Sequence, residues 1–330
     1  MRLAFHARGG AVLATAIGAS RAQVAVCDLA GEILARAGFS VDLAPGPEMV
    51  LTSVVRRMGK LLAESGRTVA DVRGVGVTLP SAVDVETGRS VSPAVVPGWG
   101  DVAIADHFTA RFPGPVRVEN DVNMLALAEQ RRRPEVDDIL VIKASTSIGA
   151  AIIGNGRLQR GALGAAGEIG HIKVADAGGA VCRCGDLDCL EAVASGWALT
   201  RSLAASGREV RDARGVADLV RAGDPDAVRL VREAGRRLGE VLAGAVNLLN
   251  PALIVIGGDL AYAYEPLVAG VRELVYQRSS AIVTRTLRIA PAVLEEEASV
   301  LACAGMVLDQ VLSPEAVDVA LSATPAPLLG

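Results

Sequence analysis

Three of the five cysteines of this chain fall within eight residues, at Cys182, Cys184 and Cys189, and His171 precedes the first of them by eleven positions. Thiolate sulfur and imidazole nitrogen are ligands of tetrahedral zinc, and a set of three cysteines and one histidine leaves no coordination position open. The alternative is a group of unrelated buried cysteines, which is improbable where cysteine is so scarce. The spacing therefore predicts a structural zinc site.

An amide and a carboxylate stand together at Asn120 and Asp121, where a predicted strand over 116–118 leads into a predicted helix over 121–133. A polar side chain there can simply cap the helix, because the first backbone N–H groups of a helix lack intrahelical partners. Asn and Asp at the carboxyl end of a strand can equally bind a sugar hydroxyl and remove its proton. The residues themselves leave both interpretations open.

Two more carboxylates flank the cysteine-rich segment. Glu168 precedes His171 by three residues, and Glu191 follows Cys189 by two. A histidine held by a metal is rigid, so Glu168 and His171 would form a preorganised polar clamp. Glu191 would be fixed by the same loop. The pattern predicts one loop that binds a metal and also positions acidic side chains for a ligand.

The composition is that of a folded protein with a large core. The chain has 330 residues, 51% of them apolar, and a net charge of −4. Disorder requires low hydrophobicity and high net charge, so a disordered chain is excluded. A chain of this length usually folds as two domains of about 100–200 residues. A mildly acidic chain is also a poor binder of nucleic acid, because that affinity comes from clustered Lys and Arg.

The apolar segments are too short for a membrane protein. No apolar run reaches the roughly 18–20 residues that a membrane-spanning helix needs. The N-terminus loosely resembles a signal peptide, with Arg2 and Arg8 before an apolar stretch over 11–19, but a strand-like pattern continues at once and favours a first β-strand. The cysteines are spaced as thiolate ligands rather than as disulfides. We therefore expect a cytoplasmic protein with no membrane partner.

Strands and helices alternate along most of the chain, which predicts an α/β protein with two lobes. Apolar residues recur at helical spacing over 48–64, and Asp224 followed by Pro225 begins the longest predicted helix. The run 253–256 is continuously apolar, as in a strand buried on both faces. Further strands are expected within 11–37 and at 72–77, 139–143, 149–153 and 287–290, and further helices at 102–111, 195–206, 215–222, 266–277 and 297–311. Residues 313–330 show no period and are expected to form a loose tail.

The polar clusters closely resemble the signature of the ROK family of repressors and sugar kinases. The run 167–171 (GEIGH) is followed by Cys182-x-Cys184-Gly-x-x-x-Cys189-Leu-Glu191. Residues 118–129 (VENDVNMLALAE) resemble the helix that carries the catalytic Asp of the family. The similarity continues at 148–161, which resembles the second glycine loop, at 247–260, which resembles the adenosine-side strand, and around Gly18, in what resembles the first phosphate loop.

The resemblance implies a fold and an assembly. The fold is the two-lobed α/β fold of actin-like and hexokinase-type proteins (ribonuclease H-like), with a cleft between the lobes and a structural zinc loop over 171–191. We expect residues 1–117 to form the N-terminal lobe, joined by a C-terminal helix over 297–312, and residues 118–296 to form the C-terminal lobe. Members of the family are usually homodimers or homotetramers, which the resemblance implies for this chain too.

The resemblance also implies roles for individual residues. Asp121 would be the base that removes a proton from a sugar hydroxyl. The sugar, a small-molecule partner, would be held by Asn120, Asp121, Glu168, His171 and Glu191, and a structural Zn²⁺ by His171, Cys182, Cys184 and Cys189. On the ATP side the corresponding positions are Gly18, Thr146, Gly149, Gly257 and Gly258, with Mg-ATP as the cofactor if the chain is a kinase. Carboxylates and amides suit this task, since charged hydrogen bonds are the stronger ones.

The phosphate-binding segments depart from the pattern of the kinases. Where the kinases carry Asp-x-Gly-x-Thr, this chain has Ala16-Ile17-Gly18-Ala19-Ser20, which lacks the carboxylate that orients Mg²⁺ and phosphate. Where they carry Gly-Thr-Gly, it has Ser145-Thr146-Ser147, whose side chains crowd the approach of phosphate to the backbone. Phosphoryl transfer depends on positioning and charge compensation, so the first loss is the more serious. Further departures fall at Pro80-Ser81-Ala82 and at Ala94-Val95.

The chain keeps the residues expected to bind a sugar but has lost residues expected to bind ATP, and two functions are compatible with this combination. The first is a sugar-responsive protein of the transcriptional-regulator type, similar to the effector domains of ROK repressors, that binds a sugar without phosphorylating it. The second is an ATP-dependent hexose or N-acetylhexosamine kinase that tolerates Ala16. A weaker third is an inactive partner of another ROK subunit. ROK repressors carry a winged helix-turn-helix ahead of this domain, and residues 1–10 are too few to form one, so we expect no DNA-binding module in this chain.

Overall fold

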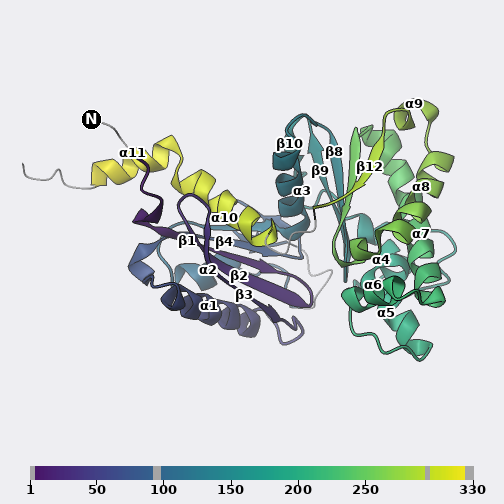
Figure 1. Cartoon of the computed structure of the whole chain (residues 1–330), viewed down its shortest axis with the longest axis horizontal. Coiled ribbons are helices and arrows are strands. Elements are labelled where there is room, and N and C mark those ends of the chain that lie inside the picture. Colours follow the sequence, from purple (N-terminus) through teal and green to yellow (C-terminus); the bar gives the residue numbers. More distant parts are fainter. Residues whose placement is uncertain (1–3, 92–97, 294–297, 324–330) are drawn as a thin grey trace, which may run out of the picture.

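The chain folds around two five-stranded sheets of mixed direction (Figure 1). The computed structural model describes residues 4–91, 98–293 and 298–323. The strand order is β3-β2-β1-β4-β7 in the first sheet and β10-β9-β8-β11-β12 in the second, and β5 pairs with β6 alone. The strands are β1 (Ala11–Ile17), β2 (Arg21–Asp28), β3 (Ile33–Ser40), β4 (Val72–Leu79), β5 (Val83–Asp84), β6 (Arg89–Ser90), β7 (Val116–Asn120), β8 (Ile139–Ala144), β9 (Ile148–Gly154), β10 (Arg157–Gln159), β11 (Leu253–Gly257) and β12 (Arg288–Pro291).

The two sheets share one topology. Strands β1, β2 and β3 form an antiparallel meander, and β4 and then β7 are added in parallel beside β1. Strands β8, β9 and β10 form a second antiparallel meander, and β11 and then β12 are added in parallel beside β8. The sequence indicates only that each half starts with a strand pair. The repeat of one topology in both halves is seen only in the structure, because it depends on the parallel strands β4, β7, β11 and β12, which are distant in the sequence from their partners.

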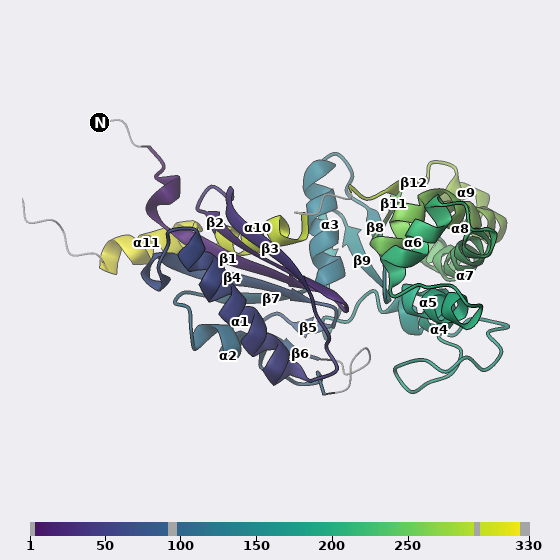
Figure 2. The same ribbon diagram turned by 60° about the horizontal axis from the view of Figure 1, so that its bottom comes forward.

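Helices cover both faces of the first sheet (Figure 2). Successive side chains of a strand point to opposite faces. Leu13 of β1 accordingly packs in the core that includes Leu51 of α1 (Pro47–Glu64) and Phe108 of α2 (Ile104–Thr109). Its neighbour Val12 packs in a separate core with Cys303 of α10 (Ala298–Val311). A helix near the end of the chain therefore completes the core of the N-terminal half.

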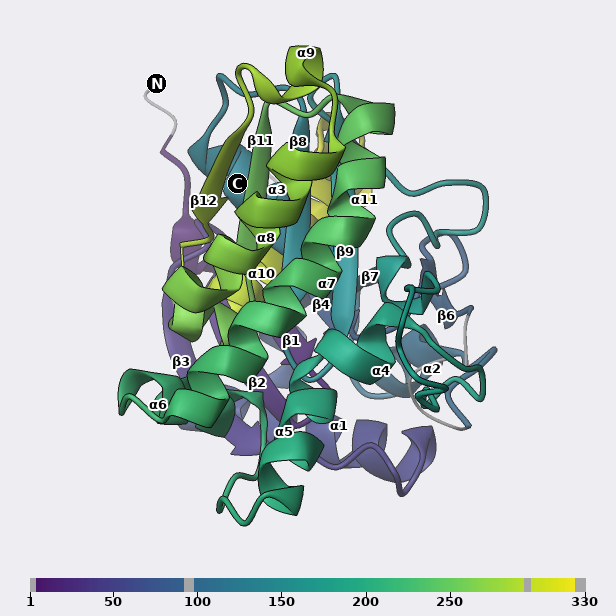
Figure 3. The same ribbon diagram turned by 90° about the vertical axis from the view of Figure 1, so that its right-hand side faces the viewer.

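The second sheet lies between α7 (Pro225–Leu249) and α8 (Tyr264–Arg278) on one face and α3 (Asp121–Arg132) on the other (Figure 3). Asp224 caps α7 as predicted, because its side chain accepts hydrogen bonds from the first backbone N–H groups of the helix. The other helices of the described residues are α4 (Leu190–Ala194), α5 (Gly196–Ala205), α6 (Ala213–Arg221), α9 (Ala281–Thr284), α11 (Pro314–Ala323) and the 3-10 helices η1 (Ala7–Gly9), η2 (Val69–Asp71), η3 (Ile169–His171) and η4 (Asp259–Ala263). Within the described residues, no helix has both the length and the apolar character that crossing a membrane requires.

The α/β class is confirmed, and the structure corrects two boundaries. The expected loose tail over 313–330 contains α11 (Pro314–Ala323), a helix that begins at a proline, where the missing N–H costs nothing. The expected lobe boundary at 117/118 falls inside β7, whose pairing with β4 keeps residues 118–120 in the first sheet. Elements of three to five residues, such as α4 and β10, were missed because they are too short to establish a period. Ala94 and Val95 lie outside the described residues.

Candidate functional site

The four predicted metal ligands come together in space. His171 ends η3, Cys182 and Cys184 lie in the loop that follows, and Cys189 is the N-cap residue of α4. Their ligand atoms all lie within 4.8 Å of one another. The Nδ1 atom of His171 is 3.8 Å from the Sγ atom of Cys182, and the Sγ atoms of Cys184 and Cys189 are 3.7 Å apart. The loop therefore folds back on itself to form one compact donor set.

The donor set fits a tetrahedral metal ion of the zinc type. Three sulfurs and one imidazole nitrogen form a closed structural set. Burial raises the pKa of the Cys182 thiol to about 12, because a thiolate loses its hydration there, and burial also raises the pKa of the Cys189 thiol. A divalent cation at the centre would reverse this cost, since the thiolate is the form that binds metal.

The cysteine loop also fixes a buried carboxylate. The side chain of Glu191, in the first turn of α4, is only 1% exposed. Its Oε1 accepts a hydrogen bond from Nη2 of Arg183 at 2.9 Å, and its Oε2 accepts one from the backbone N–H of Ile148 at 3.3 Å. The Arg183 guanidinium lies over the Trp197 ring, 5.1 Å from its centre. Arg183 stands between two of the cysteines and therefore ties the loop to Glu191.

A pocket opens beside this loop, and we call it the polar pocket. All five residues predicted to hold a sugar line it. Its complete lining is Pro80, Ser81, Asn120, Asp121, Val122, Asn123, Lys143, Ser147, Ile148, Gly149, Ala150, Gly164, Ala166, Gly167, Glu168, His171 and Glu191. Side chains from the start of α3, from η3 and from α4 thus converge on one space, although they are far apart in the sequence.

Glu168 and His171 lie beside each other in the wall of the polar pocket. The Oε2 atom of Glu168 is 3.9 Å from the Nε2 atom of His171. The pKa of Glu168 is raised, chiefly because the protein around it removes part of its hydration, although its side chain stays 40% exposed. The nearby His171 opposes this rise, and the carboxylates of Glu191 and Asp121 add to it. The preceding Gly167 has φ of +99°, and a Cβ there would lie 2.0 Å from the carbonyl oxygen of Ala150. Only glycine fits this approach of the η3 segment to β9.

Asn120 lines the polar pocket but serves as the N-cap of α3. Its side-chain oxygen accepts hydrogen bonds from the backbone N–H groups of Val122 at 2.9 Å and Asn123 at 3.3 Å. Its Nδ2 donates to the backbone oxygen of Ser81 at 2.9 Å. Of the two interpretations that the sequence left open, capping is therefore the one seen for Asn120, and these bonds use one of its two amide hydrogens. Asp121, the next residue, is the first residue of α3.

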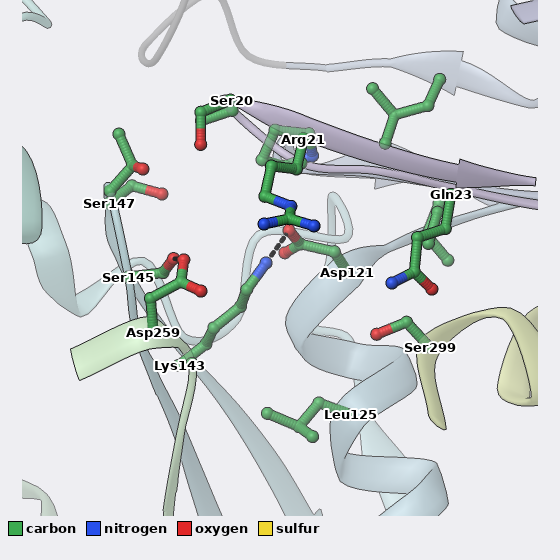
Figure 4. Close-up of a pocket in the computed structure, with 18 of the residues that line it drawn as sticks. Ser20, Arg21, Gln23, Asp121, Leu125, Lys143, Ser145, Ser147, Asp259 and Ser299 are labelled. Atoms are coloured by element: carbon green, nitrogen blue, oxygen red, sulfur yellow. Dashed lines mark hydrogen bonds and ion pairs between the residues drawn. The ribbon is translucent and has the colours of Figure 1, made fainter. Parts of the chain in front are cut away.

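A second space, which we call the hairpin cavity, adjoins Asp121 and has a volume of about 200 Å³ (Figure 4). The turn between β1 and β2, the turn between β8 and β9, and the segment after β11 surround it. It shares Pro80, Asp121, Lys143 and Ser147 with the polar pocket. The rest of its lining is Ala16, Ile17, Gly18, Ala19, Ser20, Arg21, Gln23, Thr78, Leu125, Ser145, Thr146, Arg214, Gly258, Asp259, Tyr262, Val293, Ala298 and Ser299. Asp121 therefore lies where the two spaces meet.

The predicted ATP-side residues divide between the two spaces. Three of them line the hairpin cavity, namely Gly18, Thr146 and Gly258. Gly149 lines the polar pocket instead, and Gly257 lines neither. Gly258 has φ of +90°, and a Cβ there would lie 2.4 Å from the carbonyl oxygen of Ala144, so this turn requires glycine. The predicted turns at Gly18, Thr146 and Gly258 therefore do form part of the wall of the hairpin cavity.

Two cations beside Asp121 are not anticipated by the sequence analysis. Lys143 lies on β8, and its Nζ atom contacts Oδ2 of Asp121; these side chains are 27% and 15% exposed. Arg21, the first residue of β2, points toward the same carboxylate from the hairpin (Figure 4). Ala16 contributes only a methyl group to this wall. The available signal was the lysine within the otherwise apolar strand 139–144.

The chain is similar both to glucokinases and to transcriptional regulators. The sequence model of the ROK family matches residues 12–310 of this chain. A glucokinase of Halalkalibacterium halodurans is 30% identical over 78% of this chain and 82% of its own. A solved ROK family transcriptional regulator, a homologue of the Escherichia coli MLC protein, has a TM-score of 0.77 at 26% identity and covers 92% of this chain and 79% of that one. A ROK family glucokinase from Streptomyces griseus, in complex with glucose and AMPPNP, has a TM-score of 0.75 at 27% identity, with 90% and 99% covered.

Proposed function

The chain belongs to the ROK family, and we propose that it is a sugar-binding member of the regulator type that transfers no phosphate. One observation carries the proposal: in the hairpin cavity, Lys143 pairs with Asp121 while Ala16 stands where the kinases have a carboxylate. A kinase needs that carboxylate to orient Mg²⁺, and it needs its base to take a proton from the sugar hydroxyl. Here Lys143 occupies one carboxylate oxygen of Asp121, which leaves the other oxygen to accept a hydrogen bond. The side facing the sugar keeps the polar groups that binding requires.

In this proposal the polar pocket holds the sugar. Asp121 and Glu168 would accept hydrogen bonds from sugar hydroxyls, and such bonds to charged groups are the stronger ones. Since Nδ1 of His171 faces the cysteine sulfurs and Nε2 faces Glu168, a cation bound at Nδ1 would leave Nε2 as an N–H donor toward the ligand. Asn120 and Glu191 would complete the wall, the latter held by Arg183.

The four donors His171, Cys182, Cys184 and Cys189 would hold Zn²⁺ in this proposal. The ion would supply rigidity rather than reactivity, since a closed set offers no position to a substrate. Arg183 would then hold the cysteine loop against α4 through its ion pair with Glu191, which keeps the Glu191 side chain in the pocket wall. Metal binding and sugar binding are therefore expected to be coupled.

Two measurements on the full chain test the proposal. The first is calorimetric titration with glucose, xylose and N-acetylglucosamine, and the second is a coupled ADP-release assay with the same sugars and Mg-ATP. We expect at least one sugar to bind with a Kd of about 1 μM to 1 mM and ADP release to stay at the background of the assay. Steady turnover with any sugar would contradict the proposal, and so would failure of every sugar to bind.

A second candidate is an ATP-dependent sugar kinase that uses Asp121 as its base. It is favoured by the 30% identity to a glucokinase and by the position of Asp121 between the polar pocket and the hairpin cavity. In that case Lys143 would have to release the carboxylate during each cycle. The ADP-release assay distinguishes the two candidates directly.

We also propose a homodimer or homotetramer. Leu248 at the end of α7 and Ile282 of α9 are large apolar side chains that are 83% and 73% exposed, and an oligomer interface is one way to cover such side chains. Sedimentation velocity over a range of concentrations tests this expectation. A single monomeric species at all concentrations would contradict it.

A further inference from the structure

A buried ion pair is bonded to the residues that begin α3. Glu119 lies near the end of β7, and its side chain is only 2% exposed. Its Oε1 accepts hydrogen bonds from the backbone N–H of Asn120 and from Nδ2 of Asn123, both at 2.9 Å. Its Oε2 lies 2.8 Å from both Nε and Nη2 of Arg160. Neither member of the pair lines the polar pocket or the hairpin cavity, so the pair can act on a ligand only through its neighbours.

Arg160 begins a loop over 160–167, which we call the pocket loop. Its backbone oxygen accepts a hydrogen bond from the N–H of Ala166 at 3.0 Å, so the loop closes on itself. Gly164 and Ala166 line the polar pocket, and Glu168 follows the loop directly. The side chain and the backbone of one arginine therefore join the loop to β7 and hold its shape.

The pocket loop contacts the N-terminal half of the chain at a second place. Gly164 has φ of +70°, and a Cβ there would lie 2.3 Å from the carbonyl oxygen of Val83 in β5. Only glycine allows this approach of the two backbones. The loop follows β10 and so extends from the second sheet, but both of these contacts are made to residues of the N-terminal half. Glu119 and Val83 therefore fix two points of the loop.

We propose that Glu119 and Arg160 are positioning residues for the bound sugar. Their ion pair sets the distance between the pocket loop, which leads to Glu168, and the start of α3, which carries Asp121. The hydroxyls of a sugar ring have a fixed spacing, so the groups that bind them must be held in place before binding. A carboxylate as deeply buried as Glu119 requires its cation, because loss of the partner leaves an uncompensated charge. This inference rests on the proposed function and adds two residues that determine affinity without touching the ligand.

The test measures sugar affinity in variants of the full chain, by calorimetric titration with glucose, xylose and N-acetylglucosamine. Each titration is made below the unfolding transition of the variant, which denaturant titration locates, so that a loss of folded protein does not imitate a loss of affinity. Arg160→Met is expected to weaken sugar binding by about tenfold or more, because the pocket loop loses a charged hydrogen bond. Arg160→Lys should stay within about threefold of the wild type, because both guanidinium nitrogens contact one oxygen and a single ammonium can replace them.

Two further variants separate the ion pair from a general loss of stability. Arg208→Met is the matched control, because this arginine is exposed to a similar degree, pairs with Asp224 and Asp226, and lines neither space. It should leave sugar affinity within about twofold of the wild type. Glu119→Gln leaves no buried charge and keeps a side-chain oxygen as acceptor, so it is expected to fold. It should weaken sugar binding by about threefold or more and provides the second test if Arg160→Met fails to fold.

Each outcome has one meaning. If a sugar binds the wild type and Arg160→Met or Glu119→Gln binds it as tightly, the inference is overturned and the proposed function stands. The inference is also overturned if Arg160→Lys binds as weakly as Arg160→Met, or if Arg208→Met loses as much affinity. If no sugar binds the wild type, both the inference and the proposed function fail.

Discussion

The polar pocket and the hairpin cavity adjoin the same carboxylate but are held in different ways. In the polar pocket, Glu191 is held by Arg183 and a backbone N–H, and Glu168 lies beside His171, a residue of the predicted metal site. In the hairpin cavity, Ala16 offers no carboxylate and Lys143 contacts Asp121, so cations rather than further acidic groups surround this carboxylate. This difference, between a pocket with fixed carboxylates and a cavity with cations beside its carboxylate, is the ground on which the proposed function rests.

The largest effect is expected from the cysteine loop, on which the polar pocket depends. Cys184→Ser should lower the metal content from about one ion per chain to near zero and the free energy of unfolding by about 4 kcal/mol, because metal binding contributes to folding. Sugar binding should be lost with it. Elemental analysis and calorimetry measure both. Cys303→Ala, in the core under α10, is the control and should keep its metal; a metal-free variant that still binds sugar normally would contradict the coupling.

The next effect concerns the link between the loop and the pocket wall. Arg183→Ala leaves the Glu191 carboxylate buried without its cation, which should lower the free energy of unfolding by about 3 kcal/mol. Denaturant titration measures this loss. The matched control is Arg131→Ala, which removes an exposed pair with Asp309 and should cost less than about 1 kcal/mol. Equal losses in the two variants would show that Arg183 does not hold Glu191.

A smaller effect is expected where the two spaces meet. Asp121→Asn should weaken sugar binding by about 10- to 100-fold, because hydrogen bonds to a charged acceptor are worth more than those to a neutral one. Calorimetry measures the change, and Asp309→Asn on the exposed side of α10 is the control. Unchanged affinity in Asp121→Asn would mean that the sugar does not reach this carboxylate.

The smallest effect is expected from restoring the missing carboxylate alone. Ala16→Asp should leave ADP release within about threefold of background, because Lys143 still pairs with Asp121 and charge compensation remains wrong for a metal-bound phosphate. The coupled assay with Mg-ATP measures this. A rise in ADP release of about tenfold or more would show that the carboxylate absent at Ala16 was the one missing requirement. That result would favour the kinase over the regulator.

Local spacing made the cysteine loop predictable. His171 and the three cysteines lie within one short stretch, so ligand chemistry alone brings them together, and the structure places their donor atoms within 4.8 Å. The long amphipathic helix after Asp224 was predictable for the same reason, because its cap and its period are local. The helix over 314–323 was missed because it begins at a proline and its apolar residues show only a weak helical period.

Features that depend on distant contacts could not be predicted in this way. The pairing of Lys143 with Asp121 joins β8 to the start of α3, and no periodicity shows which face of a buried strand turns toward a cavity. The role of Arg183 depends on where α4 and Trp197 pack. For Asn120 the sequence left capping and sugar binding both open, and only the structure shows the hydrogen bonds that make it the cap of α3. Its contact with a sugar stays a prediction.

The central claim, that the chain binds a sugar but cannot phosphorylate it, is tested most directly in a single turnover. The chain, in excess over Mg-ATP and saturated with a sugar shown to bind, is quenched at intervals, and the sugar phosphate is measured by mass spectrometry. The account predicts no sugar phosphate above the level formed without protein, even after hours. Conversion of the ATP to an equal amount of sugar phosphate, abolished by Asp121→Asn, would contradict it.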